Sequence, residues 1–408
     1  MVEVWLPYGD TEVYISVDLK NFLGKLEPED RSPNESPEKI LSEALGGDGG
    51  KILEESTSAK SSTAIAVEGT TEPYISVKVL NELANGLGAH GVTKDKISII
   101  IGNGTRQKSN MKLLNAIRND EALADISLYE HGPESSDLTK LGSTSLGTPV
   151  SVNRHYADAD LKIAVGEVWP DAYTGFTGAH TAVLPGISGF ETIESSRLHY
   201  FKGKEPGVTQ SNKLKDDALE AADIAGVDIA LNLLVSTGGG LLDAYTGSLE
   251  GSWNSALESL DGCYELDTKE RGDIVVASSG GRKRDFDLYH ALWTLKTADK
   301  ACKRNGTIIL IAECIEGLGV ESLNSMASIR QLDEFERRYR LGAEAVHLVK
   351  SLARSKRLIL VSVLPDYLIE SLGFETSRNA NTAYEMALRG SKGKKTLVMP
   401  YGCFTLPS

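Results

Sequence analysis

The segment 161–187 constrains the fold more than any other part of the chain. It begins with the apolar run LKIAVG, which predicts a buried β-strand. The run stops at Gly166, and a loop with Asp171, Gly175 and Gly178 follows before the chain reaches VLPGI. A buried strand that leads through a glycine-rich loop into a helix is how α/β proteins present backbone N–H groups to anions. The segment therefore predicts an α/β protein with an anion-binding loop after this strand.

Apolar strands and helices alternate through most of the remaining sequence. Helices are expected at 37–45, 74–87, 110–117, 211–225, 252–260, 286–304, 329–355 and 377–389. Strands are expected at 63–67, 97–102, 126–131, 161–166, 227–235, 273–278, 307–312, 358–363 and 396–399. Continuous apolar strands between helices predict mostly parallel sheets that are covered on both faces. Before them, residues 2–6 and 12–17 flank a turn at 8–10 and predict a β-hairpin.

The length of the chain predicts two domains. A chain of 408 residues exceeds the size that one hydrophobic core supports. The polar stretch 267–272 separates two series of strands and helices. We therefore expect an α/β domain at 1–266 and a second α/β domain at 267–408.

Charge and cysteine usage limit the partners and the compartment. The net charge is −14, which disfavours nucleic acid and anionic membranes as partners but leaves room for a local basic pocket. No stretch approaches the roughly 18 apolar residues of a membrane span, and the N-terminus does not resemble a signal peptide. The four cysteines form no CxxC pair, which disfavours zinc and favours the cytoplasm. The expected partner is a small anionic metabolite, and a homo-oligomer remains open.

Four loops are candidates for a ligand site because each follows a predicted strand. In parallel sheets, ligands bind beyond the carboxyl ends of the strands. The loops span 68–73, 102–106, 166–178 and 278–285, and three of them contain closely spaced glycines. Glycine lets backbone N–H groups converge on an anion. The alternative is that these are ordinary tight turns.

Cations and histidines in these loops suggest how a ligand would be held. Arg282 and Lys283 lie at a predicted helix start, where cations oppose the helix dipole unless an anion binds, although a solvated turn is the alternative. Arg106 ends another buried strand. His180 lies in the 166–178 loop region and is a candidate for proton transfer. No histidine pair has the spacing of metal ligands, so a site built from His180 and His199 is disfavoured and no metal ligand is predicted.

Several motifs together resemble the nickel-dependent lactate racemase family over nearly the full length. They are LPYG, ADLKIAVGE, GFTG followed by VLPGI, DIVVASSGG followed by DLYHAL, and GKKTLVMPYG. The resemblance implies two α/β domains with the active site in the cleft between them. It implies inversion of a 2-hydroxy acid carbon, with a nickel-pincer nucleotide that accepts hydride and two histidines that act as acid and base. A lysine holds the cofactor covalently in that family, and a histidine helps to bind nickel.

At the matching positions this chain carries other residues. Counting back from the VLPGI motif, the family's lysine position holds Thr181, and a catalytic histidine position holds Asp171. The metal-binding histidine position holds Arg197, and the other catalytic histidine position holds Arg106. A guanidinium cannot bind a metal and does not act as a base, and threonine cannot form the link to the cofactor. In the family's DHTRP motif, Glu72 replaces an arginine.

A further lysine position of the family aligns with Trp293.

Together these replacements lead us to expect a divergent isomerase or epimerase of a 2-hydroxy or keto acid that lacks the covalent nickel-pincer cofactor. Proton transfer is assigned to Asp171, His180 or Glu72. Substrate binding is assigned to Arg106, Arg197, Arg282, Lys283, His290, Gly104, Thr105, Gly178 and Thr181.

Three alternatives remain open. The chain is an orthodox nickel-dependent racemase whose ligands align differently, or a non-catalytic protein that binds a metabolite. A third alternative is a nucleotide site at the 280–283 loop. Bound nickel would favour the racemase, and a ligand that binds without turnover would favour the non-catalytic protein. Protection of the 280–283 loop by a nucleotide would favour the nucleotide site.

Overall fold

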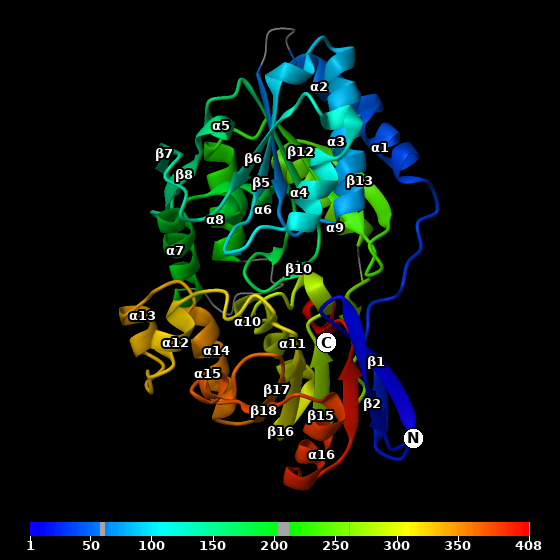
Figure 1. Ribbon diagram of the computed structural model, residues 1–408, viewed down its shortest axis with the longest axis vertical. Helices are drawn as coiled ribbons and strands as arrows, with labels where there is room; N and C mark the ends of the chain where they lie inside the picture. Colours follow the sequence, from blue (N-terminus) through cyan, green and yellow to red (C-terminus); the bar gives the residue numbers. More distant parts are fainter. Residues whose placement is uncertain (58–61, 203–211, 261, 408) are drawn as a thin grey trace. The chain divides into compact units, whose positions relative to one another are not determined.

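Each of the two compact units of the described chain contains a six-stranded, mostly parallel sheet (Figure 1). The computed structural model describes residues 1–57, 62–202, 212–260 and 262–407. One unit is Asp30–Asp261, and the other combines Met1–Glu29 with Gly262–Ser408. The predicted α/β fold class with mostly parallel sheets is confirmed.

The unit Asp30–Asp261 contains five parallel strands and one antiparallel edge strand among its described residues. In spatial order they are β13 (Leu241–Gly247), β12 (Ile229–Val235), β9 (Leu161–Glu167), β4 (Thr63–Glu68), β5 (Ile97–Gly102) and β6 (Ser127–His131). The parallel strands β12, β9, β4 and β5 are almost continuously buried, as their unbroken apolar runs predict. Two small hairpins also occur, β7 (Leu138–Ser143) with β8 (Pro149–Asn153), and β10 (Pro170–Asp171) with β11 (Gly175–Phe176).

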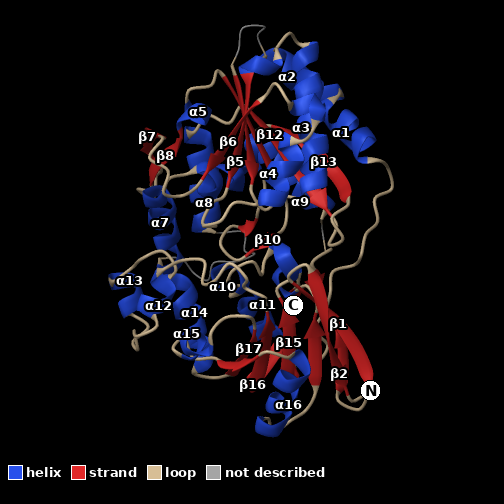
Figure 2. Cartoon of the chain, viewed as in Figure 1, coloured by secondary structure: helices blue, strands red, loops and turns tan. Residues whose placement is uncertain are grey.

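Helices cover both faces of this sheet (Figure 2). They are α1 (Pro37–Leu45), α2 (Gly47–Ser56), α3 (Pro73–Ala89), α4 (Met111–Arg118), α5 (Arg154–Ala157), α6 (Ala179–Thr181), α7 (Phe190–Leu198), α8 (Lys213–Ile224) and α9 (Leu249–Ser259). The start of α8 is fixed by Asn212, whose side chain accepts hydrogen bonds from Leu214 N and Lys215 N. The helix expected at 211–225 is confirmed within the described residues, and Ser211 lies outside them.

The second unit has a wholly parallel six-stranded sheet. Its order is β18 (Glu375–Ser377), β17 (Arg357–Val361), β16 (Cys302–Ile311), β15 (Gly272–Ser278), β19 (Thr396–Met399) and β3 (Phe22–Lys25). The hairpin β1 (Val2–Tyr8) and β2 (Thr11–Val17) packs on one face beside α16 (Ala380–Gly390), as the colours of Figure 1 show for the two chain ends. Their shared core includes Val4, Leu6, Ile15, Val17, Val276, Ile309, Ala383 and Val398.

Six further helices are described in this unit. They are α10 (Leu288–Ala291), α11 (Thr294–Ala301), α12 (Ser322–Met326), α13 (Glu334–Arg337), α14 (Ala343–Ala353) and α15 (Asp366–Glu370). A two-residue bridge joins β14 (Glu265–Leu266) to β20 (Leu406–Pro407). Among the described helices, none is long and apolar enough to cross a membrane.

Two expected helices are wrong in extent. The helix expected at 329–355 is divided into α13 and α14, because Gly342 between them has φ +99°, which a right-handed helix cannot contain. The helix expected at 286–304 is divided into α10 and α11 and ends at Ala301. From Cys302 onward the chain is β16, where pairing with β15 overrides the helical pattern.

The division into units also differs from the expected boundary between 266 and 267. The first 29 residues group with Gly262–Ser408 rather than with the sheet that follows them in sequence. The physical reason is pairing and burial. β3 is hydrogen-bonded to β19, and the apolar side of the β1–β2 hairpin completes the core of that sheet.

Candidate functional site

The sheet of the unit Asp30–Asp261 reverses its strand order between β4 and β9, and a buried carboxylate lies at that point. From β4 the chain proceeds to β5 and β6 on one side, while β9 and β12 lie on the other. Glu167 ends β9 and is 2% exposed. Its carboxylate accepts hydrogen bonds from Glu72 N at 3.0 Å and from Trp169 Nε1 at 2.7 Å. Such reversal points are where open α/β sheets bind ligands.

The loop that follows β5 is held against the turn that carries Pro185. Gly104, with φ +56°, donates its N–H to Gly186 O at 3.0 Å. A Cβ on Gly102 would lie 2.6 Å from the carbonyl carbon of Gly186, so only glycine permits this approach. Thr105 and Arg106 follow, and they are 5% and 8% exposed. The loop therefore fixes a guanidinium at the carboxyl edge of the sheet.

Asn103 in the same loop has an unused acceptor. Its Nδ2 donates to Glu130 Oε1 at 3.1 Å, while its buried Oδ1 has no hydrogen-bond partner in the described chain. A buried acceptor without a donor is unfavourable by about 1–3 kcal/mol. A ligand hydroxyl would satisfy it.

The β10–β11 hairpin uses Asp171 to close its own turn. Asp171 Oδ2 accepts from Tyr173 N at 2.9 Å, from Thr174 N at 2.7 Å and from Thr174 Oγ1 at 3.0 Å. The guanidinium carbon of Arg197, on α7, lies 3.4 Å from the centre of the Tyr173 ring. This stacking places Arg197 on the same hairpin as Asp171.

His180 lies in the hydrophobic core behind this hairpin. Its side chain has no exposed surface, and neither ring nitrogen makes a hydrogen bond of normal geometry in the described residues, although the backbone of Phe176 lies close enough to favour the protonated ring. The ring meets Trp253 edge to face, with centroids 5.3 Å apart. Burial lowers the pKa of His180 from 6.5 to about 4, and the nearby charge of Asp171 opposes this shift. His180 is therefore a neutral imidazole at neutral pH.

Thr181 is engaged by the backbone next to it. Its hydroxyl donates to Gly178 O at 2.7 Å and accepts from Gly178 N at 3.1 Å. Gly178 itself packs closely, because a Cβ on Gly166 would lie 2.2 Å from the Gly178 carbonyl oxygen. Both residues therefore shape the loop after β9.

These residues do not fit a covalently held nickel-pincer nucleotide. Thr181 offers a hydroxyl that the Gly178 backbone already binds, and it has no amine to form the link. The Arg197 guanidinium is a cation stacked on Tyr173 and has no lone pair for nickel. Among the described residues, no group of three or more His, Cys, Asp and Glu side chains has the geometry of a metal site. No chemical step of this chain is therefore assigned to that cofactor.

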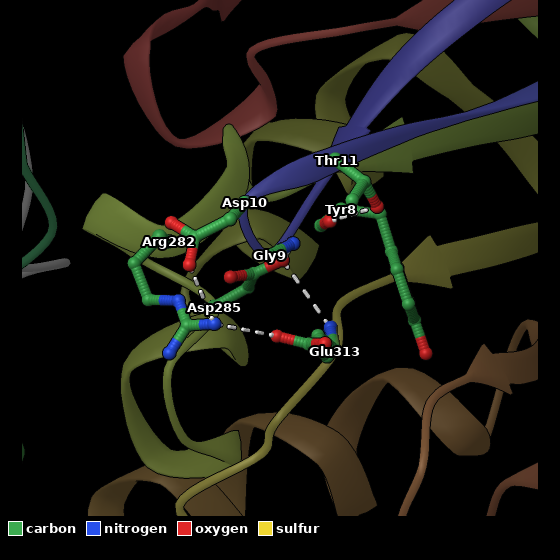
Figure 3. Close-up of polar contacts among 7 residues, drawn as sticks. All are labelled: Tyr8, Gly9, Asp10, Thr11, Arg282, Asp285 and Glu313. Carbon is green, nitrogen blue, oxygen red and sulfur yellow. Dashed lines mark hydrogen bonds and ion pairs between the residues drawn. The ribbon is translucent and has the colours of Figure 1, made fainter.

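The second unit presents its own polar cluster after β15 (Figure 3). One guanidinium nitrogen of Arg282 lies 3.0 Å from Asp10 Oδ2 and 3.3 Å from Glu313 Oε2. Asp285 is fully buried and accepts from Gly9 N at 2.8 Å and Glu313 N at 3.2 Å. Burial raises the pKa of Asp285. Arg282 thus connects the turn of the first hairpin to the ends of β15 and β16.

The other predicted residues of this loop have local contacts too. His290 Nδ1 and Asp287 Oδ1 lie 2.8 Å apart, and the same oxygen accepts from His290 N at 2.9 Å. Asp287 is buried and caps α10. Lys283 lies in the short 3₁₀ turn Gly281–Lys283. The arrangement gives these residues structural roles and leaves their binding roles as predictions.

Within the unit Asp30–Asp261 the predicted residues fall into four sets of contacts. Arg197 stacks on Tyr173 beside Asp171, whose charge reaches His180. Gly104, which precedes Thr105 and Arg106, meets Pro185 and Gly186; Gly178 bonds to Thr181; and Glu72 N donates to Glu167. Arg282, Lys283 and His290 belong to the other unit. Sequence reasoning missed Glu167 and Asn103. A signal for Glu167 was present, because it is an acid that directly ends a buried apolar strand.

Comparisons with known proteins identify both parts of the chain. Residues 8–207 match the lactate racemase N-terminal domain, and residues 267–404 match the lactate racemase C-terminal domain. A lactate racemase of Thermoanaerobacterium thermosaccharolyticum is 26% identical over 329 residues, which cover 79% of this chain and 76% of that protein. A lactate racemase of Lactiplantibacillus plantarum is 25% identical over 350 residues, which cover 82% and 80%.

Solved structures agree on the fold. The lactate racemase apoprotein from T. thermosaccharolyticum matches with a TM-score of 0.86 at 20% identity and covers 100% of both chains. A protein from Thermotoga maritima matches with a TM-score of 0.70 at 14% identity and covers 93% of this chain and 99% of its own. Because the two domain models together match most of the sequence, this chain belongs to the lactate racemase family.

Proposed function

We propose that this protein is an isomerase or epimerase of a small anionic 2-hydroxy acid, and that it works without a covalently held nickel-pincer nucleotide. The observation that carries the proposal is the loop after β5. It holds the buried guanidinium of Arg106 and the unsatisfied acceptor Asn103 Oδ1 within four consecutive residues. A guanidinium suits a carboxylate, and an acceptor suits a hydroxyl donor. A 2-hydroxy acid offers both groups on adjacent carbons.

Proton transfer is assigned to a carboxylate of the same unit. Glu72 is partly exposed at the reversal point of the sheet, and Asp171 is partly exposed in the β10–β11 turn. His180 would have to move to reach a ligand, because its ring is fully enclosed. Removing a proton next to a carboxylate is difficult without an electron-withdrawing partner. A keto group already present in the substrate or an added metal ion would supply one.

Isotope exchange tests the proposal directly. The full chain is incubated in D₂O with D-lactate, L-lactate, D-malate or L-malate. Proton NMR then follows loss of the Cα–H signal, and chiral chromatography follows inversion. We expect exchange and inversion of at least one acid in protein purified without added nickel. Absence of exchange together with absence of any rise in melting temperature for all four acids would refute the proposal.

Variants of the loop locate the site. Arg106→Gln should raise KM about tenfold or more, and Arg106→Lys should recover part of the loss. Arg389→Gln is the matched control, because Arg389 is an exposed arginine on α16. Asn103→Ala should lower the affinity for the hydroxy acid about tenfold. It should leave the affinity for pyruvate unchanged, since pyruvate has no hydroxyl donor. Equal effects on both acids would mean that Asn103 only supports the loop.

Two other functions are each favoured by one observation. The curated relatives named lactate racemase favour the orthodox nickel enzyme. Stoichiometric nickel and a covalent mass increase, after co-expression with the maturation enzymes, would establish it. The use of Thr181 and Asp171 in local backbone contacts favours a non-catalytic metabolite binder. Ligand-induced stabilisation without isotope exchange would establish that function.

A cytoplasmic location, also proposed, is supported by four cysteines that form no disulfide.

A further inference from the structure

A groove of about 420 Å³ lies beside the first strand of the chain, within one compact unit. The residues along β1 form one side of it. The rest is lined by Glu12 of β2, by Phe22 and Lys25 of β3 with Glu27 after it, and by Pro400 and Tyr401 after β19. This groove is separate from the loops described above. It combines an unpaired strand edge, aromatic rings and acidic side chains.

The backbone edge of β1 is open, whereas the equivalent edge of β2 is covered. Trp5 pairs with Tyr14 and Glu3 pairs with Ser16 in the hairpin register. On the β2 side, Asn381 accepts from Ser16 N at 2.9 Å and donates to Tyr14 O at 3.1 Å. These bonds show that Ser16 and Tyr14 direct their N–H and C=O groups away from β1, toward the outer edge of the hairpin.

The same alternation directs the N–H and C=O groups of Glu3 and Trp5 outward from β1, next to the groove. In the part of the chain that the structure describes, no hydrogen bond from another element meets them. The open edge ends at Pro7, which has no N–H and whose carbonyl accepts from Ser278 Oγ at 2.5 Å. An added strand could therefore make four main-chain hydrogen bonds, two at each open residue.

The side chains around the groove define the chemistry of that strand. Glu3, Glu12 and Glu27 are acidic, and the cation Lys25 is already paired with Glu27. Trp5 is 54% exposed on the outer face of the hairpin. Glu3 and Trp5 alternate with the buried Val4, so a neighbouring strand would place alternate side chains beside the acids and the indole. Lysine or arginine fits those positions through ion pairing and cation–π contact.

We propose that this edge binds an extended basic peptide segment of a partner protein by strand addition to β1. Its alternate side chains are cationic beside Glu3 and Trp5 and apolar above Phe22. A second copy of this chain is disfavoured as the occupant, because each copy carries a net charge of −14. The charge complementarity therefore selects a basic partner.

Fluorescence anisotropy with the full chain tests the proposal. The probe is a labelled, capped peptide of alternating lysine and valine. Its controls are the glutamate–valine peptide and a lysine–valine peptide that is N-methylated at alternate residues and so lacks donors on one edge. We expect binding of the first peptide only, with affinity at least about tenfold above both controls. Equal binding of the N-methylated peptide, or no binding of the lysine peptide, would overturn the proposal.

Variants of the protein separate backbone pairing from charge. Trp5→Pro removes an outward N–H that the hairpin does not use, while Trp5→Ala keeps it. Binding should be lost in Trp5→Pro and weakened less in Trp5→Ala. Glu3→Lys should weaken binding about tenfold, and Glu336→Lys, an exposed acid on α13, should leave it unchanged. Melting temperatures establish that each variant is folded.

Sedimentation velocity tests the other occupant. Self-association of the wild-type chain that Trp5→Pro abolishes would assign the edge to a second copy and overturn the proposal. A monomer that binds the lysine peptide supports it.

Discussion

Burial decides the protonation state of His180, and this makes the stability of the protein sensitive to acid. The pKa of this imidazole is 6.5 when exposed and about 4 in the folded chain. Between these values the unfolded chain binds more protons than the folded one. The free energy of unfolding is therefore unaffected by this group above about pH 6.5. It falls as the pH drops toward 4, by roughly 3 kcal/mol in total. Urea unfolding across this pH range measures the loss.

A His180→Phe variant isolates the contribution, because it keeps a ring against Trp253 but does not titrate. Its stability should fall less steeply with acid than that of the wild type. Burial also lowers the pKa of His131, His199 and His347, and these groups remain in both proteins. A difference between the two proteins that stays constant from pH 4 to 7 would contradict the prediction.

Asp217 on α8 is a second residue whose burial is decisive. Its fully buried carboxylate accepts from Thr144 Oγ1 at 2.6 Å and from Thr148 Oγ1 at 2.9 Å. Asp217→Ala would leave the buried hydroxyl of Thr144 without its acceptor, and the Thr148 hydroxyl would keep only its contact with His199 Nε2 at 3.2 Å, so we expect a loss of about 1–3 kcal/mol in the free energy of unfolding. Asp216→Ala is the control, since this exposed neighbour should change stability by less than about 0.5 kcal/mol. Equal losses in chemical denaturation would disprove the role.

Residues of the candidate site were predictable in position but not in contacts. Glycines after apolar strands located the loops around Gly104 and Gly178, because the strand pattern determines where the carboxyl edge lies. The bonds of Thr181 to Gly178 and of Asp171 to Thr174 depend on turn geometry that spacing does not encode. The sequence therefore predicted proton transfer by Asp171 and substrate binding by Thr181, but it did not show that both residues shape the backbone.

At the scale of elements, continuous apolar runs were the reliable signal. The strands β5 and β19 have the bounds expected at 97–102 and 396–399. Both faces of a buried parallel strand are covered, so apolar residues are favoured at every position along it. The periodicity of 329–355 is helical at both ends, but it does not reveal that Gly342 between them adopts a left-handed conformation. The antiparallel pair β7 and β8 was also missed, since every residue of β7 is partly or fully exposed and the strand has no apolar run.

Gly342 gives a direct test of why that helix is divided. Its φ of +99° strains any other residue, and a Cβ there would lie 2.6 Å from Val320 Cγ2 and 2.9 Å from Leu323 Cδ1. Gly342→Ala should cost about 2–4 kcal/mol from backbone strain and overpacking together. Gly317→Ala has a similar φ of +96° but meets no atom within 4 Å, so it should cost only about 1–2 kcal/mol. Thermal and urea unfolding compare them, and equal costs would exclude the packing contribution.

At the scale of the whole molecule, one compact unit is assembled from both ends of the chain. Residues Met1–Glu29 supply β3, which pairs with β19 in the sheet of Gly262–Ser408. They also supply Val4, Leu6, Ile15 and Val17, which are at most 4% exposed in the shared core. Burial of each such side chain stabilises the fold by about 1.5–3 kcal/mol. Sequence order alone assigned these residues to the other domain, because hairpins do not reveal which sheet they cover.

This assembly predicts how the chain responds to dissection. A fragment of residues 262–408 should lack cooperative unfolding, because it exposes the face that the first hairpin covers and leaves β19 as an open edge. Addition of a synthetic peptide of residues 1–29 should restore a cooperative transition, observed by near-UV circular dichroism. A fragment of residues 30–261 should unfold cooperatively without any addition, since its sheet contains strands from that range only. A cooperative transition of 262–408 alone, unchanged by the peptide, would show that the first residues are dispensable for this core.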